Sequence, residues 1–127
     1  MAKIRLPKRS KNEPFLAIPK ALIESTKLNG LSGVAVKLLI QIAVQYTGSN
    51  NGDLQASFCV FKYKGWKSSD TFNRALKELV DNGYLVRTRQ GRFPNVCSLF
   101  ALTWKDIDES VKYDSVSFIG KRIGGWK

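Results

Sequence analysis

The stretch of sequence that decides the fold is WKSSDTFNRALKELVDNG, residues 66–83. Ser68 or Ser69 can cap a helix here, because a serine hydroxyl accepts a hydrogen bond from the first free backbone N–H groups. Gly83 stands where a helix commonly ends in a left-handed residue. Between these ends, apolar residues recur at helical spacing and predict one buried stripe, made of Phe72, Ala75, Leu76, Leu79 and Val80.

The opposite face of this predicted helix is polar. Residues 70, 74, 77 and 81 lie nearly in line, since helical neighbours are three and four positions apart. The face carries Asp70, Asn73, Arg74, Lys77 and Asp81. Amide and cationic side chains in this arrangement can read a DNA groove. An ordinary solvated surface helix presents the same pattern, so the helix alone leaves both interpretations open.

The composition indicates a basic protein. The chain has 127 residues, and 21 lysines and arginines against 10 acidic residues give a net charge of +11. This length predicts one domain, and the hydrophobic content of 43% is enough for a core. A charge excess of this size favours a polyanionic partner, either nucleic acid or an anionic membrane surface. Charge kept for solubility is the alternative interpretation.

The sequence offers little for catalysis, metal binding or membrane insertion. It contains no histidine, the commonest general base and metal ligand. Cys59 and Cys97 are too few and too far apart for a cysteine-rich zinc site, and we expect buried free thiols. No apolar run is long enough to cross a bilayer, and no signal peptide is recognisable. We therefore expect a cytoplasmic protein that is not an enzyme and uses no cofactor.

Two short elements are predicted before the first long helix. Residues 15–18 form an apolar run that suits an edge strand, and Pro19 ends it. Residues 19–27 suit a short helix with proline at its first position, which would bury Leu22 and Ile23.

The most hydrophobic helix is predicted over residues 31–46, with Ser32 as its N-cap. One stripe would pack in the core, namely Ala35, Leu38, Leu39, Ile42, Ala43 and Tyr46. A second stripe, Val36, Ile40 and Val44, would need cover from a terminal segment or from a second subunit. A homodimer through this stripe or through the C-terminal tail is therefore a candidate. The polar line of the helix is limited to Lys37, Gln41 and Gln45.

A β-hairpin is predicted after the helix of residues 66–83, because the spacing of apolar residues changes there from 3.6 to 2. Residues 84–89 and 96–104 suit its two strands. By simple alternation Arg87 and Arg89 share one face, and Arg92 lies at the tip. The second strand is apolar on both faces, so we expect a further segment to cover its outer face.

The order of elements is that of a winged helix-turn-helix domain. We predict an α+β fold, mainly α, with three to four helices and a C-terminal β-hairpin wing. The helix-turn-helix would comprise a helix at 57–64 with Phe58, Phe61 and Val60 inward, a turn at 65–67 and the helix at 68–82. The predicted regions are a flexible basic arm at 1–13, the winged helix-turn-helix domain at 14–104, and a C-terminal extension at 105–127 that packs on the domain or on a partner.

The predicted arrangement supplies a chemistry for DNA contact. A helix N-terminus offers free N–H groups and a positive dipole end to phosphate. Asn73 can pair with adenine and Arg74 with guanine through two hydrogen bonds, while other cations meet phosphates. The candidate DNA-binding residues are Lys62, Lys64, Lys67, Ser68, Ser69, Asp70, Asn73, Arg74, Lys77, Arg87, Arg89 and Arg92.

Several short stretches share residues with one known family. They are residues 31–32, 46, 50–54, 65–68, 71, 74–79, 82–84, 88–91 and 101–104. In these the chain resembles winged helix-turn-helix proteins carried by phages, plasmids and proteobacterial genomes. It is also similar to DNA-binding domains of transcriptional regulators and replication initiators. Phe72 departs from the family pattern, which commonly has a small aliphatic residue there, and the C-terminal tail lies outside it.

The resemblance implies a double-stranded DNA-binding protein, sequence-specific or general, that acts as a regulator or replication accessory. The recognition helix would enter the major groove and the basic wing would contact the backbone. The alternative is a winged-helix module that binds an acidic protein surface, such as a phage-encoded inhibitor of a host nucleic-acid enzyme.

Overall fold

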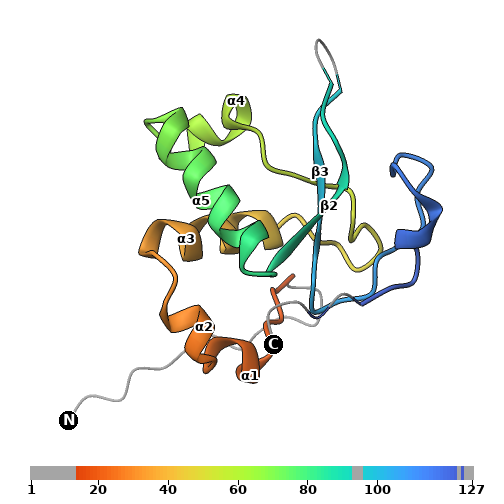
Figure 1. The fold of residues 1–127 in the computed structure, drawn as a ribbon, viewed down its shortest axis with the longest axis horizontal. Coiled ribbons are helices and arrows are strands. Elements are labelled where there is room, and N and C mark those ends of the chain that lie inside the picture. The colour runs from red at the N-terminus through yellow and green to blue at the C-terminus, as the bar shows by residue number, and fades with distance from the viewer. Residues whose placement is uncertain (1–13, 93–95, 123, 125–127) are drawn as a thin grey trace.

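The computed structural model describes residues 14–92, 96–122 and 124. Within these ranges the chain is α+β and mainly helical, and its helices gather on one side of a three-stranded antiparallel sheet (Figure 1). The predicted basic arm, residues 1–13, lies outside the described residues. The helices are α1 (Lys20–Ile23), α2 (Thr26–Asn29), α3 (Gly33–Ala43), α4 (Phe58–Phe61) and α5 (Ser69–Asp81). The strands are β1 (Leu54–Gln55), β2 (Leu85–Arg89) and β3 (Leu99–Leu102). No helix in the described ranges is long and apolar enough to cross a membrane.

Helix α5 confirms the helix that was predicted within residues 66–83. The Ser68 hydroxyl accepts a hydrogen bond from the Thr71 N–H at 3.3 Å. The helix ends in a Schellman motif: the Gly83 N–H donates to the Val80 carbonyl at 3.1 Å and the Tyr84 N–H donates to the Leu79 carbonyl at 3.0 Å. Gly83 has a φ of +81°, which a residue without a Cβ adopts at little cost. Both ends of α5 are thus determined by local sequence.

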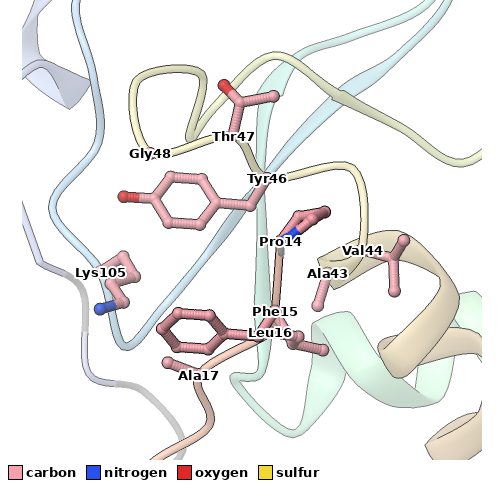
Figure 2. A pocket seen from close by; sticks show the side chains of 10 residues that line it. All are labelled: Pro14, Phe15, Leu16, Ala17, Ala43, Val44, Tyr46, Thr47, Gly48 and Lys105. Atoms are coloured by element: carbon pink, nitrogen blue, oxygen red, sulfur yellow. The ribbon is translucent and has the colours of Figure 1, made fainter. Parts of the chain in front are cut away.

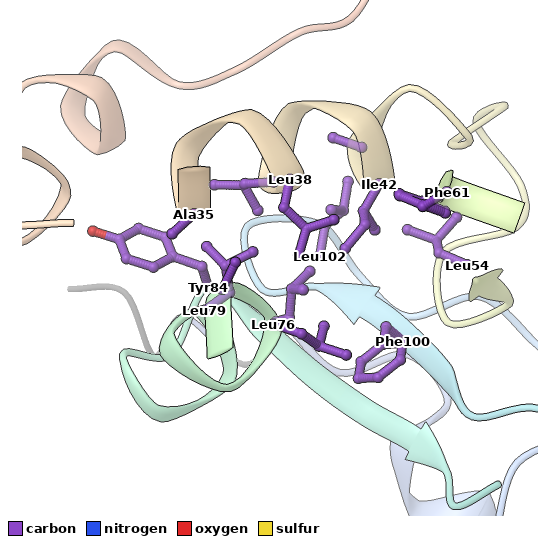
Figure 3. Close-up of a cluster of buried hydrophobic side chains, with 14 of the residues drawn as sticks. Ala35, Leu38, Ile42, Leu54, Phe61, Leu76, Leu79, Tyr84, Phe100 and Leu102 are labelled. Carbon is purple, nitrogen blue, oxygen red and sulfur yellow. The ribbon is translucent and has the colours of Figure 1, made fainter. Parts of the chain in front are cut away.

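Helix α3 packs over α5 and the sheet, and Figure 3 shows their side chains meeting in one core. The Ser32 hydroxyl caps α3 by accepting from the Ala35 N–H at 3.3 Å. The first predicted stripe is buried, except that Tyr46 lies beyond the helix and is half-buried. In the second stripe Val44 remains 64% exposed and Ile40 45% exposed, so no described segment covers it fully.

The sheet has the order β1-β3-β2, which makes β3 its central strand. All four residues of β3 are buried, as its two apolar faces predict. Phe100 and Leu102 belong to the core under the helices. On the other side of the hairpin runs the C-terminal segment (Figure 1), where the Asp114 N–H donates to the Thr88 carbonyl of β2 at 2.9 Å.

A register shift in β2 overturns the prediction that Arg87 and Arg89 share one face. Arg87 pairs with Phe100, but Arg89 pairs with Leu99, so Thr88 is an extra residue in the ladder. Neighbouring residues of β3 point to opposite faces, and a residue follows the face of its partner. Arg87 therefore lies on the core side of the sheet, at its edge, and Arg89 lies on the outer side.

Several other expectations about the first half of the chain are wrong. Residues 15–18 form no strand. The helix predicted at 19–27 is two single turns, because Ser25 ends α1 and caps α2 by accepting from the Leu28 N–H at 3.1 Å. A single turn buries one side only, which leaves Ile23 47% exposed in α1 and Val60 46% exposed in α4. Cys59, also predicted to be buried, is exposed for the same reason.

Asn51 is a completely buried polar residue that joins the tight turn before β1 to the far end of β3. Its side-chain amide donates to the carbonyls of Leu102, Lys105 and Asp106 at 3.1 Å each. Its side-chain oxygen accepts from the Leu102 N–H at 2.7 Å. Its backbone N–H donates to the Asp108 carboxylate at 2.8 Å, and its carbonyl accepts from the Tyr113 hydroxyl at 3.0 Å. Asn51 is therefore a main point of attachment of the C-terminal segment, beside the contact between Asp114 and Thr88.

Candidate nucleic-acid interface

Three elements of the predicted DNA-binding surface lie toward the same end of the molecule. Figure 1 shows the N-terminal end of α5, helix α4 and the described residues of the hairpin that follow β2 and precede β3 toward the upper end, with α1 and α2 at the lower end. The 3-10 turn Lys62–Lys64 links α4 to the loop before α5. We call this end of the molecule the basic end, because the 3-10 turn there carries Lys62 and Lys64.

Helix α3 fixes the backbone of the turn that leads into α5. The Gln41 side chain donates to the Lys64 carbonyl at 3.2 Å and accepts from the Trp66 indole N–H at 2.6 Å. The Lys37 ammonium lies 5.2 Å from the centre of the Trp66 ring. The polar line of α3 therefore holds the segment between α4 and α5 in place rather than facing water alone. At the start of α5, Lys37, Lys67 and Ser68 help to line a small hollow of about 210 Å³.

An aromatic cluster around Phe72 joins α4 to α5. The Phe72 ring is buried and lies 5.4 Å from the rings of Phe61 and Trp66 and 5.9 Å from that of Phe58, measured between centres. Tilted and edge-on rings at these distances attract one another beyond their burial. A small aliphatic residue could not reach all three rings, so the bulk of Phe72 suits the aromatic residues of α4 and the turn.

The outer face of α5 is fully available. Asn73 is exposed, as is Arg74, which forms an ion pair with Asp70 at 2.6 Å; both side chains of this pair are 75% exposed. Lys77 forms a similar pair with Asp81 at 2.6 Å. Exposed pairs of this kind contribute about 0–1 kcal/mol, so a ligand can displace them at small cost. Asp70 also stabilises the positive N-terminal end of the helix.

The segment before α5 is basic and free of acidic residues. Residues 54–69 contain no aspartate or glutamate. Lys62, Lys64 and Lys67 are all exposed, as is the candidate Ser69. The Lys62 ammonium lies 5.2 Å from the centre of the Tyr63 ring, and that of Lys64 lies 5.2 Å from the centre of the Phe61 ring. These cations lie beside aromatic rings and leave their hydrogen-bond donors free for an anion.

The three arginines of the hairpin differ in how they are held. The Arg89 guanidinium donates twice to the Cys97 carbonyl, at 3.0 and 2.8 Å, and so braces the hairpin from within. Arg87 is exposed, with its guanidinium 5.3 Å from the centre of the Phe100 ring and a hydrogen bond of 3.2 Å to the Gln90 side chain. Arg92 is exposed where the strands make their last bridge, to Val96. Arg87 and Arg92 are thus better placed than Arg89 to meet a phosphate.

Glu78 is a structural residue of the site that sequence reasoning missed. Its carboxylate accepts from the backbone N–H of Ser32 at 2.8 Å and from the Ser32 hydroxyl at 2.7 Å. The pair connects the N-terminus of α3 to the middle of α5 across 46 residues of sequence. Glu78 lies in α5 and Ser32 caps α3. Residues this far apart in sequence form no local pattern, so the sequence alone does not predict their contact.

A second hollow lies away from the basic end. It is an open pocket of about 730 Å³ between residues 14–17, the C-terminal end of α3 and the loop that follows (Figure 2). Its lining is mainly apolar, and Val44 of the uncovered stripe forms part of it. Lys105 is the one basic side chain among the described residues that line it. The pocket suits an apolar partner group better than a nucleic acid.

In the described part of the chain no three histidine, cysteine or acidic residues come together in a way that could hold a metal ion. Cys97 is half-buried and, like Cys59, a free thiol. Comparison of the chain with protein-family models, with curated proteins and with solved structures finds no match.

Proposed function

We propose that this protein is a winged helix-turn-helix protein that binds double-stranded DNA. In this proposal α5 is the recognition helix and enters the major groove, and the β2–β3 hairpin is the wing that contacts the backbone. Helix α4 with its 3-10 turn forms the first part of the helix-turn-helix. A regulatory or replication-accessory role, of the kind found in phages and plasmids, is the biological setting that we infer.

The observation that carries the proposal is the outer face of α5. Asn73, Arg74 and Lys77 are exposed, and none of them contributes to the core. They project from a helix whose other face is anchored through four buried residues. Lys62 and Lys64 belong to the 3-10 turn after α4, which lies at the same end of the molecule as the N-terminal end of α5, and Arg87 and Arg92 belong to the hairpin that extends toward that end (Figure 1). A rigid helix with exposed polar side chains, flanked by cations on both sides, suits a groove lined by phosphates.

The chemistry of each residue defines its proposed role. Asn73 can form two hydrogen bonds with adenine and Arg74 two with guanine. Lys62, Lys64, Lys67, Lys77, Arg87 and Arg92 would contact phosphates and position the helix. Asp70 would hold Arg74 in the free protein and release it to a base. Arg89 would act indirectly, by bracing the hairpin.

The test is a fluorescence-anisotropy titration with random duplex DNA at 50 and 200 mM salt. We expect binding at low salt that weakens by roughly 10³-fold or more at the higher salt, as for about six or more phosphate contacts. Arg74→Ala should weaken binding to a selected site by roughly 5- to 150-fold, from the loss of a bidentate base contact of about 1–3 kcal/mol.

A charge-matched control is Lys20→Ala, since Lys20 is exposed on α1 at the opposite end of the molecule (Figure 1). It removes one positive charge as Arg74→Ala does, but should change affinity less than twofold. Equal effects of the two variants would mean that only the net charge matters, and would overturn α5 as the recognition helix.

The uncovered stripe on α3 favours a second candidate function, the binding of a protein. Val44 and Ile40 are exposed beside the open pocket of Figure 2. A homodimer of the DNA-binding protein, or an acidic partner protein, could occupy this surface. Light scattering measures the molar mass of the wild type and of Val44→Glu, and so tests whether a homodimer forms through this surface. A monomer in both, together with no DNA binding at low salt, would favour the protein-binding role.

A further inference from the structure

Tyr63 is the most exposed aromatic side chain among the described residues. It is 83% exposed, whereas Phe61 and Trp66, its aromatic neighbours in sequence, are 1% and 5% exposed. The structure therefore buries the aromatic residues of this segment with one exception. The phenol ring packs on no core residue, so core packing does not account for its position.

The backbone that carries Tyr63 is held firmly. It lies in the middle of the 3-10 turn Lys62–Lys64, directly after α4. The Lys64 carbonyl accepts a hydrogen bond from Gln41 of α3 at 3.2 Å. Gly65, with a φ of +94°, then turns the chain toward α5. Tyr63 is thus an exposed ring on a fixed support, and little conformational entropy is lost when it contacts a ligand.

The surroundings of the ring are positively charged. Lys62 lies with its ammonium 5.2 Å from the centre of the ring, and Lys64 is exposed on the other side in sequence. The nearest acidic residues along the chain are already paired, Asp53 with Lys112 at 2.9 Å and Asp70 with Arg74 at 2.6 Å. An anion that approaches Tyr63 therefore meets two lysines and no free carboxylate of its own segment.

We propose that Tyr63 is a stacking platform for an unpaired base of DNA. The ring would stack on the base, and Lys62 and Lys64 would contact the phosphates on either side. A flat, exposed ring between cations is the combination that binds single strands, since every base has a face on which a ring can stack and every nucleotide carries a charged phosphate. The inside of an intact duplex offers no free base face. The inference rests on the proposed function for its choice of DNA, and it adds a preference for unpaired nucleotides.

The test uses three labelled probes of one sequence: an intact duplex, the same duplex with three unpaired nucleotides, and the single strand. We expect Tyr63→Ala to weaken binding to the two probes with unpaired bases by roughly 5- to 150-fold, corresponding to about 1–3 kcal/mol for one stacked base. Affinity for the intact duplex should change less than twofold. Tyr63→Phe keeps the ring and should bind all three probes as the wild type does.

Two controls keep the result interpretable. Val60→Ala shortens another exposed side chain nearby, in α4, and should affect none of the probes. Thermal unfolding should show that Tyr63→Ala is folded, because the side chain it removes is outside the core. Equal losses by Tyr63→Ala on all three probes would mean that the tyrosine contacts backbone, and no loss on any probe would mean that it contacts nothing. Either result overturns the inference.

The outcomes also separate this inference from the proposed function. If Arg74→Ala weakens binding to the duplex while Tyr63→Ala changes binding to none of the three probes, the proposed function stands and the stacking platform is overturned. Binding to the single strand alone, with loss in Tyr63→Ala, supports the platform and removes the major-groove proposal. No binding to any probe at 50 mM salt overturns both.

Discussion

The two faces of the sheet are covered in different ways. On one face, α3 and α5 contribute apolar side chains that form a continuous core with Phe100 and Leu102. On the other face, Leu99, Ala101 and Ile107 are buried outside that core, and the C-terminal segment is also attached by hydrogen bonds through Asn51, Thr88 and their partners. The first covering therefore depends on a large buried area, whereas the second adds directed contacts to a smaller one.

This difference teaches where the protein tolerates change. Apolar packing is non-directional, so its cost on substitution scales with the volume that is lost. A buried hydrogen-bond network is directional, and removing one partner leaves several groups unsatisfied at once. On the face of the sheet that packs against α3 and α5, we expect each substitution to lower the free energy of unfolding in proportion to the volume it removes. On the outer face, covered by the C-terminal segment, we expect a few polar residues to account for most of the loss.

The largest effect should come from the helix face, at Phe72. Phe72→Ala leaves a cavity among three aromatic rings, and we expect the free energy of unfolding to fall by about 3–5 kcal/mol. Phe72→Leu refills part of that volume and should cost roughly half as much. Urea denaturation of both variants measures the two losses. Equal losses would show that the ring contacts, rather than the buried volume, stabilise this face.

A smaller but still large effect is expected on the outer face, at Asn51. Asn51→Ala leaves the Leu102 N–H and three carbonyls without their side-chain partner, and should lower the free energy of unfolding by about 2–3 kcal/mol. Asn73→Ala makes the same chemical change on an exposed helix face and should cost less than about 0.5 kcal/mol. Hydrogen exchange should show greater loss of protection in residues 107–122 than in α3. Uniform loss would mean that both faces unfold together.

The smallest effect depends on pH and concerns Tyr113. Burial, with the charges of Asp53 and Asp108, raises its pKa to about 12. The neutral hydroxyl donates to the carbonyls of Asn51 and Asp108, at 3.0 and 2.7 Å, and Tyr113→Phe should cost about 1 kcal/mol at pH 8. A tyrosine in the unfolded chain ionises near pH 10, so the stabilisation is complete below pH 10 and is lost as pH rises toward 12. The difference between wild type and variant should therefore shrink between pH 8 and pH 11. A difference that grows with pH would contradict this assignment.

The sequence predicted the helix face of the molecule well, for a physical reason. In α5 the apolar period, the Ser68 cap and Gly83 each act on residues only a few positions away in sequence. The two strands of the hairpin, β2 and β3, were also predicted, although both are shorter than predicted. Local patterns of this kind can be recognised in the sequence without knowing which distant residues the element contacts in the folded protein.

The errors concern contacts between distant residues. The alternation of Arg87 and Arg89 failed because Thr88 is inserted in the ladder, where its carbonyl binds the Asp114 N–H. Gln41 was predicted to be part of a polar face, and only the folded chain shows that it holds Lys64 and Trp66. The candidate site was predicted as a set of residues, but Arg89 proved to be a brace within the hairpin. DNA binding itself stays a prediction.

The covering of β3 has a consequence for how the protein is made. A ribosome releases the chain from its N-terminus, so α3 and α5 emerge before β3 and can form a core first. Leu99 and Ala101 face outward until residues 107–114 have also emerged, because that segment closes the outer side of the sheet. During this interval a nascent strand with an apolar outer face is available to other chains. A chain that ends after Trp104 should therefore aggregate during synthesis even though all three strands are present.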